Sequence, residues 1–251
     1  MGDNMTKLLI YSFTVLILII IALILIKKYV KEEKTKDNIL KIFALITVIL
    51  HYSSLWVDYF TTGEAKVDSN MLLPIYPCNI CMWMLLIVAF MKNKKGTVYK
   101  ILSEFLALGG TVCGLIGLFF NEIFLSNPDF LDYDSLKGLL SHTTMIFGTM
   151  FLVSEGFVKI RTISMTLSNA IGLLIFALIG AIINTLFYIF NLDPVNAMYM
   201  LEFPLDIPGA SFITLGIVGV IAAFIITSIY ELIFLTPSDR WYNNLKKHSE
   251  V

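Results

Sequence analysis

Two residue types that can perform nucleophilic chemistry together, cysteine and histidine, occur within apolar stretches of this sequence. Cys78 and Cys81 belong to the stretch LLPIYPCNIC, and His142 lies in the stretch LLSHTTMIFG. A thiol becomes an effective nucleophile when a neighbouring imidazole accepts its proton and a third polar group orients that imidazole. We therefore predict that Cys78 is a nucleophile and that His142 is its base, with Asn79, Asn184 or His51 as the orienting group.

The same side chains leave two other interpretations open. Two cysteines and two histidines can bind zinc in a tetrahedral site, but here the histidines come from separate segments, and we expect no metal. Cys78 and Cys81 stand at positions i and i+3, so they share a helical face and could form a disulfide. A cysteine within a membrane segment is usually a small hydrophobic residue, and we expect this of Cys113.

The composition indicates that these residues lie in a membrane. The chain has 251 residues, of which 57% are hydrophobic and 15% are charged, and its mean hydropathy is +0.81. Soluble domains are roughly 45–50% apolar and 25% charged. The composition excludes a soluble enzyme, a disordered chain and a disulfide-rich secreted domain. The net charge of −1 indicates no nucleic-acid partner.

Apolar segments of about 18–25 residues, each long enough to cross a bilayer, predict seven transmembrane helices. They cover about 8–26, 39–60, 72–91, 101–120, 136–154, 166–190 and 210–235. Most of the 18 Lys and Arg residues fall in alternate loops, and acidic residues dominate the others. The positive-inside rule then predicts an outer N-terminus and a cytoplasmic C-terminus. We expect an all-α, polytopic membrane helix bundle that forms one domain over residues 1–251.

The candidate residues share one predicted depth. Counted from the predicted helix ends at 1.5 Å per residue, they lie roughly 9–11 Å below the outer interface. They are His51, Cys78 with Asn79, His142 and Asn184. Ionisable groups are costly in a bilayer and usually have a function there. Pro74 and Pro77 disturb the start of the third predicted helix, which makes either a pocket or simply a bent helix end.

Other features of the sequence predict packing and loop structure. Glycines cluster in the fourth predicted helix at 109, 110, 114 and 117, and in the sixth at 172 and 180, where they indicate close helix packing. Glu104 and Glu155 lie near basic loops, so we expect ion pairs. The outer loop at 191–208 either folds back over the bundle as a lid or is a plain connector.

The order of five stretches resembles a known family over residues 40–235. These stretches are LLPIYPCNIC, LSEFLALGG, LLSHTTMIFG, GAIINTLFYIFNLDPVNAMYM and PGASF. They resemble the YwaF-type family of bacterial seven-span membrane proteins, which is related to the eukaryotic transmembrane protein 164 acyltransferases. The resemblance implies a Cys–His acyl-transfer site in a bacterial plasma membrane, with Cys78 in the L-P-x-x-x-C element and His142 in the S-H element. It gives Asn184 and Asn196 supporting roles.

One position departs from that family pattern. Relatives often have histidine two residues before the cysteine, where this chain has Tyr76. With that difference noted, we expect an intramembrane lipid acyltransferase or acyl hydrolase that forms an acyl-thioester and needs no cofactor. Its partner would be a membrane phospholipid or lysophospholipid. Two alternatives stay open: a transporter or small-solute-binding membrane protein, and a non-catalytic structural membrane protein.

Overall fold

The computed structural model describes residues 2–64, 73–202 and 209–243, and within these residues every regular element is a helix. The elements are α1 (Gly2–Tyr29), α2 (Glu33–Thr62), α4 (Pro77–Phe90), α5 (Thr97–Phe105), the π-helical turn η1 (Leu106–Gly110), α6 (Thr111–Phe119), α7 (Glu122–Ser126), α8 (Tyr133–Ser154), α9 (Thr162–Ile189), the short η2 (Ala197–Tyr199), α10 (Phe212–Phe234) and η3 (Pro237–Asp239). The predicted all-α class is confirmed for the described residues.

Among the residues that the structure describes, six helices are long and apolar enough to cross a membrane. They are Asp3–Tyr29, Glu33–Thr62, the run Thr97–Ser126, Tyr133–Ser154, Thr162–Ile189 and Phe212–Phe234. Each corresponds to a predicted span, and most extend a few residues further at one or both ends. The protein is therefore an integral membrane protein by composition and helix length. Residues 65–72 and 203–208, which fall partly within predicted features, lie outside the described residues.

The third predicted span, at 72–91, forms a shorter helix than expected. Its helical part, α4, has only 14 residues, which at 1.5 Å per residue is about 21 Å and falls short of a core of about 30 Å. The cause is Pro77, which stands at the first helical position and holds Tyr76 in an extended conformation at φ −99° and ψ 151°. Seven spans and the orientation are thus not confirmed and stay predictions.

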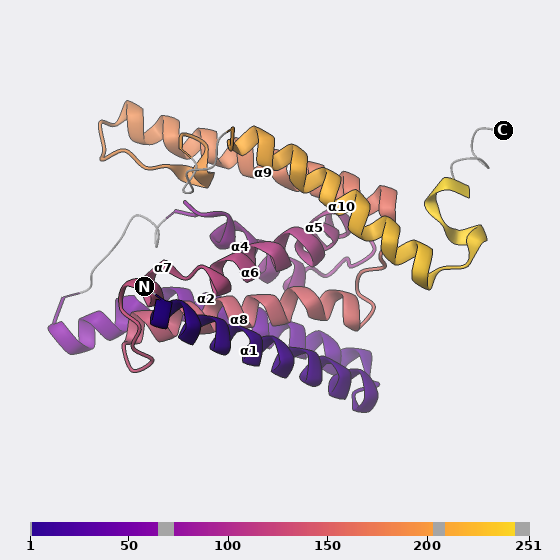
Figure 1. Cartoon of the computed structure of the whole chain (residues 1–251), viewed down its shortest axis with the longest axis horizontal. Coiled ribbons are helices and arrows are strands. Elements are labelled where there is room, and N and C mark those ends of the chain that lie inside the picture. Colours follow the sequence, from indigo (N-terminus) through magenta and orange to yellow (C-terminus); the bar gives the residue numbers. More distant parts are fainter. Residues whose placement is uncertain (1, 65–72, 203–208, 244–251) are drawn as a thin grey trace.

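The helices form three layers (Figure 1). In that view α9 and α10 lie on one side, α4, α5 and α6 lie in the middle, and α1, α2 and α8 lie on the other side. The layers are joined by contacts of α5 with α9, of α6 with α8, and of α2 with α4. The short helix α4 is therefore surrounded by the longer ones, and most of its residues are buried.

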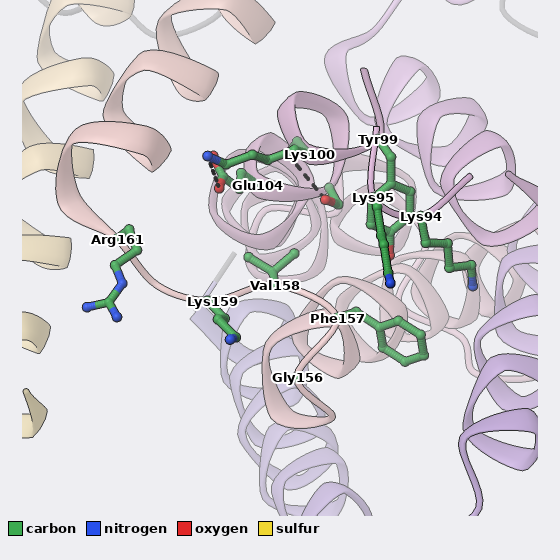
Figure 2. Close-up of a pocket in the computed structure, with 11 residues that line it drawn as sticks. Lys94, Lys95, Tyr99, Lys100, Glu104, Gly156, Phe157, Val158, Lys159 and Arg161 are labelled. Carbon is green, nitrogen blue, oxygen red and sulfur yellow. Dashed lines mark hydrogen bonds and ion pairs between the residues drawn. The ribbon is translucent and has the colours of Figure 1, made fainter. Parts of the chain in front are cut away.

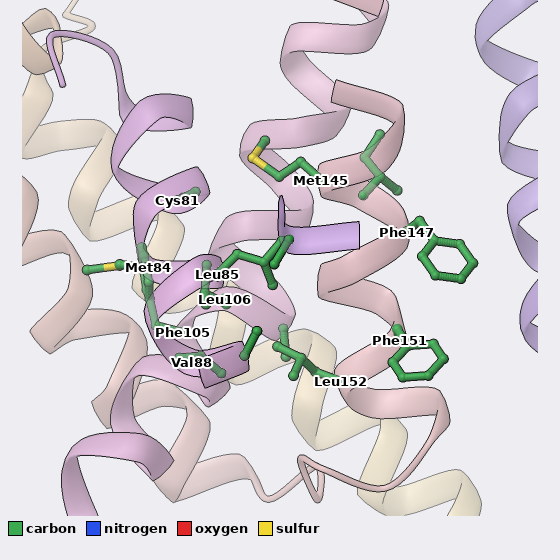
Figure 3. Close-up of a cluster of buried hydrophobic side chains, with 14 of the residues drawn as sticks. Cys81, Met84, Leu85, Val88, Phe105, Leu106, Met145, Phe147, Phe151 and Leu152 are labelled. Carbon is green, nitrogen blue, oxygen red and sulfur yellow. The ribbon is translucent and has the colours of Figure 1, made fainter. Parts of the chain in front are cut away.

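The buried face of α4 builds the hydrophobic core. Figure 3 shows Leu85 and Val88 among side chains from the fourth predicted helix and from α8, including Leu106 and Leu152. All four side chains are completely buried. Because Leu85 fits against Gly148 of α8, a Cβ at Gly148 would lie 2.8 Å from a Leu85 methyl carbon. The central layer is packed tightly enough to hold its polar residues in fixed positions.

Glycines make these close contacts possible, as the sequence predicted. A Cβ at Gly114 of α6 would lie 2.7 Å from Ile146 of α8, and a Cβ at Gly172 of α9 would overlap the ring of Phe105. Phe105 precedes the π-helical turn η1, whose extra residue is a common device at functional sites. Small residues let helices approach in lipid, where no hydrophobic effect drives them together.

The two acidic side chains near the basic loops are paired, which confirms the prediction for them. Glu155, at the end of α8, lies 3.4 Å from the Lys36 ammonium of α2. Glu104 of α5 accepts hydrogen bonds from Ser164 at 2.7 Å and from Ser168 at 2.7 Å, and it lies 3.9 Å from the Lys100 ammonium. These pairs connect helices at the basic end of the bundle.

The Gly172–Phe105 contact predicts a stability difference between two glycine substitutions. Gly172→Ala should lower the free energy of unfolding by about 1–3 kcal/mol, because the new methyl group overlaps the Phe105 ring. Gly216→Ala in α10 is the matched control, since nothing lies within 4 Å of its Cβ position. Thermal unfolding in detergent checks this, and equal melting temperatures for the two variants would contradict the packing.

Candidate functional site

The candidate nucleophile lies in the first turn of α4. Cys78 follows Pro77, is partly exposed, and donates a weak hydrogen bond through Sγ to the side-chain oxygen of Asn79 at 3.5 Å. Asn79 is buried. The first turn of a helix carries partial positive charge from unpaired backbone N–H groups, which favours negative charge on a group placed there. The sequence pair Pro77–Cys78 therefore positions a thiol at a helix start inside the bundle.

Cys113 joins this thiol, which sequence reasoning missed. It lies on α6 close to both Cys78 and Cys81, and the Cys81 and Cys113 thiols interact directly. From the sequence we expected Cys113 to be only a small hydrophobic residue, and its place beside the other thiols follows from the packing of α6 against α4. All three cysteines are free, so the structure contains no Cys78–Cys81 disulfide.

The candidate base comes from α8. The imidazole of His142 lies against Gly117 of α6, so closely that a Cβ at Gly117 would overlap the ring. Gly117 stands four residues after Cys113, which places both on one face of α6 about one turn apart. Counting residues from the predicted helix ends gave only the depth of His142. The four-residue spacing of Cys113 and Gly117 is the signal that could have shown that His142 faces α6.

His51 is the second histidine at this level. It lies on α2 near His142, close enough for the two imidazoles to interact electrostatically, and its ring makes an edge-on contact with Tyr52 at 5.0 Å. The helices that carry the two histidines, α2 and α8, pack along one another. Of the predicted orienting groups, His51 is therefore the one placed beside the candidate base.

The thiols and imidazoles thus form two neighbouring groups, which we call the thiol–imidazole cluster: Cys78, Cys81 and Cys113 on one side, and His51 and His142 on the other. Gly117 and Cys113 of α6 connect them. No hydrogen bond joins Cys78 to His142 within the described residues, because the thiol donates to Asn79 instead. No set of three or more His, Cys, Asp or Glu side chains suited to a metal ion occurs in the described part of the chain, so the zinc interpretation gains no support.

Asn184 holds a loop over the start of α4 and does not contact the cluster. Its side chain accepts a hydrogen bond from the Ala197 N–H at 2.8 Å and donates one to the Ala197 carbonyl at 3.3 Å. The next residue, Met198, donates its N–H to the Ile75 carbonyl at 2.8 Å. The described part of the outer loop therefore folds back over the bundle, and Asn184 anchors it.

Asn196 and Tyr76 belong to the same loop contact. The Asn196 side chain bonds the backbone of Leu201 and Glu202, which closes the loop on itself. Tyr76 lies 5.6 Å from Tyr199 between ring centroids, and Tyr199 also lies near Cys78. Burial raises the pKa of the Tyr199 phenol above its ordinary value, so it stays protonated and can donate a hydrogen bond.

The loop is held in a strained conformation where it passes Cys78. Met198 and Tyr199 have positive φ angles of 58° and 55°, a region that costs a non-glycine residue about 1–3 kcal/mol. The hydrogen bonds of Ala197 and Met198 and the packing of Met198, which is 1% exposed, offset that cost. Gly180 of α9 makes room, because a Cβ there would lie 2.6 Å from Met200 Sδ.

A cavity of about 390 Å³ lies beside the loop. Its lining includes Phe187, Val195 and Leu201 together with Asn184 and Asn191, so it is mostly apolar with two amides on its wall. Ligand pockets in proteins are typically about 300–1,000 Å³ and apolar with few polar groups. The cavity is therefore large enough for part of an acyl chain.

The sequence matches a model described as the TMEM164 family over residues 3–236. The match covers nearly the whole chain and begins in α1, which extends it beyond the 40–235 range indicated by the short motifs. No curated protein and no solved structure matches the chain.

The contact between His142 and Gly117 predicts a compensating pair of substitutions. Gly117→Ala should lower the free energy of unfolding by about 1–3 kcal/mol, because its methyl group collides with the imidazole. In a His142→Ala background the same change should cost much less, since the space is then open. Melting temperatures of the two single variants and the double variant give the coupling. Strictly additive effects would contradict the contact, and Gly219→Ala, whose Cβ makes an ordinary 3.7 Å contact, is the control.

The hydrogen bonds of Asn184 predict a local change in the outer loop. Asn184→Ala removes both bonds to Ala197, so the amide of Met198 should exchange with solvent at least tenfold faster, on the basis of about 1.4 kcal/mol per factor of ten. Hydrogen–deuterium exchange measures this. Thr185→Ala, on the exposed side of the same helix turn, should leave the exchange unchanged. Equal exchange in all three proteins would show that Asn184 does not anchor the loop.

Proposed function

Because the chain belongs to the TMEM164 family, we propose that it is a lipid-modifying enzyme of the bacterial plasma membrane that moves acyl chains between phospholipids or releases them to water. Cys78 would be the nucleophile and His142 the general base. The family is compatible with a lipid-related membrane protein, and the helices are long and apolar enough for the bilayer. Phospholipid and lysophospholipid are the proposed substrates.

The observation that carries this proposal is the gathering of thiols and imidazoles on α2, α4, α6 and α8. The three thiols gather where α4 meets α6, and the two imidazoles lie about one turn of α6 away, with His142 against Gly117. A packed core has no need of two histidines, because a buried polar group costs free energy unless it is satisfied. Clusters of titratable groups inside a fold are typical of active sites.

The proposed reaction has two acyl exchanges. In the first, His142 takes the thiol proton as Cys78 Sγ attacks the ester carbonyl; the C–S bond forms, the C–O bond breaks, and the imidazolium returns the proton to the departing lysolipid oxygen. In the second, a lysolipid hydroxyl or water gives its proton to His142 and attacks the thioester, and Cys78 leaves as the thiolate and regains the proton. His51 would orient His142.

Proton transfer needs a small rearrangement from the structure described above. Cys78 Sγ donates to Asn79, so the thiol must rotate toward His142 or use one bridging water. Catalytic hydrogen bonds are often long in proteins without substrate and shorten when substrate binds. A free thiolate is costly among apolar side chains, which favours attack together with proton loss.

Lipid would reach the site from the side of the bundle. The apolar cavity next to the outer loop can take part of an acyl chain. Tyr199, which belongs to this loop, lies near Cys78. Residues 73–76 precede α4 without helical structure and add to its length, so the third segment can still cross the bilayer. We propose that the protein crosses seven times and that the site faces the outer leaflet.

Replacement of Cys78 tests the proposal most simply. With purified protein, a phospholipid labelled in its acyl chain and an unlabelled lysolipid, Cys78→Ala should reduce acyl transfer to background. His142→Gln should reduce it by about 10²–10⁴-fold, the usual contribution of a general base. Cys113→Ala is the matched control, since it removes a thiol from the same cluster. It should keep most of the activity.

Other results would change the functional assignment. Full activity in both Cys78→Ala and Cys78→Ser would remove the nucleophile, and loss confined to Cys113→Ala would move that role to α6. A wild-type protein that moves no acyl chains but carries a solute across vesicles would favour the transporter alternative. A protein that neither moves acyl chains nor carries a solute would favour the structural alternative, if Cys78→Ala, His142→Gln and Cys113→Ala also leave its stability unchanged.

A further inference from the structure

A second pocket lies at the other end of the bundle and is lined by cations. Figure 2 shows it between the α4–α5 connection, the start of α5 and the α8–α9 turn. Its volume is about 330 Å³. Five of its lining residues are basic: Lys94, Lys95, Lys100, Lys159 and Arg161. They come from two connections far apart in sequence, so the fold, and not one local basic run, brings the charges together.

The five cations of the pocket differ in whether an acidic side chain of the protein pairs with them. Lys94 pairs with Asp37 and lies 4.9 Å from the centre of the Phe157 ring. Burial lowers the pKa of Lys94, because a partly desolvated ammonium is less well stabilised by water. Lys95 and Lys159 are exposed at the rim. The pocket therefore holds more positive than negative charge.

Glu104, the acidic residue that lines the pocket, already has hydrogen-bond and ion-pair partners. Glu104 receives hydrogen bonds from Ser164 and Ser168 and lies near Lys100, so its charge is distributed over these partners. Figure 2 shows Glu104 on the Lys100 side of the opening, away from Lys94 and Lys95. Even with Glu104 near Lys100 and Asp37 paired with Lys94, the five cations leave the pocket with a net positive charge.

Tyr99 supplies a second, independent observation. It lines the pocket, is only 3% exposed, and its hydroxyl has no hydrogen-bond partner in the described part of the chain. A buried hydroxyl without a partner costs free energy, so native proteins normally satisfy such groups. Figure 2 shows the Tyr99 ring beside Lys94 and Lys95. A ligand with acceptor oxygens would satisfy this hydroxyl and neutralise the neighbouring cations together.

We propose that this pocket binds the phosphate group of an anionic phospholipid. Phosphate has the acceptor oxygens and the negative charge that Tyr99 and the five cations require. The pocket opens where α5 and α9 begin and α8 ends, which is the depth of lipid headgroups for helices that cross a membrane. Phe157 and Val158 on its lining offer apolar contact to the glycerol and upper acyl region. Basic pockets between transmembrane helices are suited to headgroups of this kind.

Lipid binding can be tested on the full chain in detergent by native mass spectrometry. Phosphatidylglycerol should bind at least tenfold more tightly than phosphatidylcholine, whose headgroup carries no net charge. Lys95→Gln together with Lys159→Gln should weaken phosphatidylglycerol binding by about 10- to 30-fold, as expected for two headgroup-level charges. Both side chains are exposed, so the variant should fold normally.

A matched pair controls for general surface charge. Lys34→Gln with Lys92→Gln removes two exposed cations near the same end of the bundle but outside the pocket lining, and it should change binding less than about twofold. Tyr99→Phe removes only the unpaired hydroxyl. It should weaken phosphatidylglycerol binding without lowering the melting temperature of the lipid-free protein.

Three results would overturn the inference. Equal affinity for the two lipids would mean that the pocket does not recognise the headgroup charge, and equal weakening by the two lysine pairs would mean diffuse attraction to a charged surface. Full competition by inorganic phosphate or glycerol phosphate at the lipid's own concentration would mean that the pocket takes a soluble anion. Tyr99→Phe binding as tightly as the wild-type protein would remove the hydroxyl from the site.

Discussion

The close contact of α6 with α8 along glycines is the constraint on which the candidate site depends. Because Gly117 has no side chain, the imidazole of His142 lies directly on α6, one turn from Cys113. Gly114 allows the same approach at Ile146. If either helix carried a larger residue at these positions, α8 would move outward and the two histidines would separate from the thiols.

A second constraint comes from proline at the start of α4. Pro77 begins the helix, so Cys78 lies in its first turn, while the extended residues before it offer the Ile75 carbonyl to the outer loop. Asn184 then fixes that loop from the α9 side. The thiol is therefore covered by a strained segment at Met198 and Tyr199 without being sealed, since Cys78 stays partly exposed.

Six of the seven spans predicted from hydropathy correspond to long apolar helices among the described residues. This agreement arises because length and apolarity are local properties of each segment. The glycine contacts and the pairing of Glu155 with Lys36 were also predictable from spacing and charge. The short α4 was not, since the effect of two prolines on helix length depends on the packing around them. Depth counting did not indicate that Asn184 bonds the outer loop, because it gives the level of a residue and not the direction it faces around the helix axis.

Mass spectrometry of the protein after brief incubation with phospholipid tests the central claim most directly. The account predicts an acyl group attached to Cys78 through a thioester, released by hydroxylamine and absent when His142 is replaced by glutamine. The same adduct should be missing from Cys81 and Cys113. An enzyme that turns over lipid while Cys78 stays unmodified, or that carries the acyl group on another residue, would contradict the account.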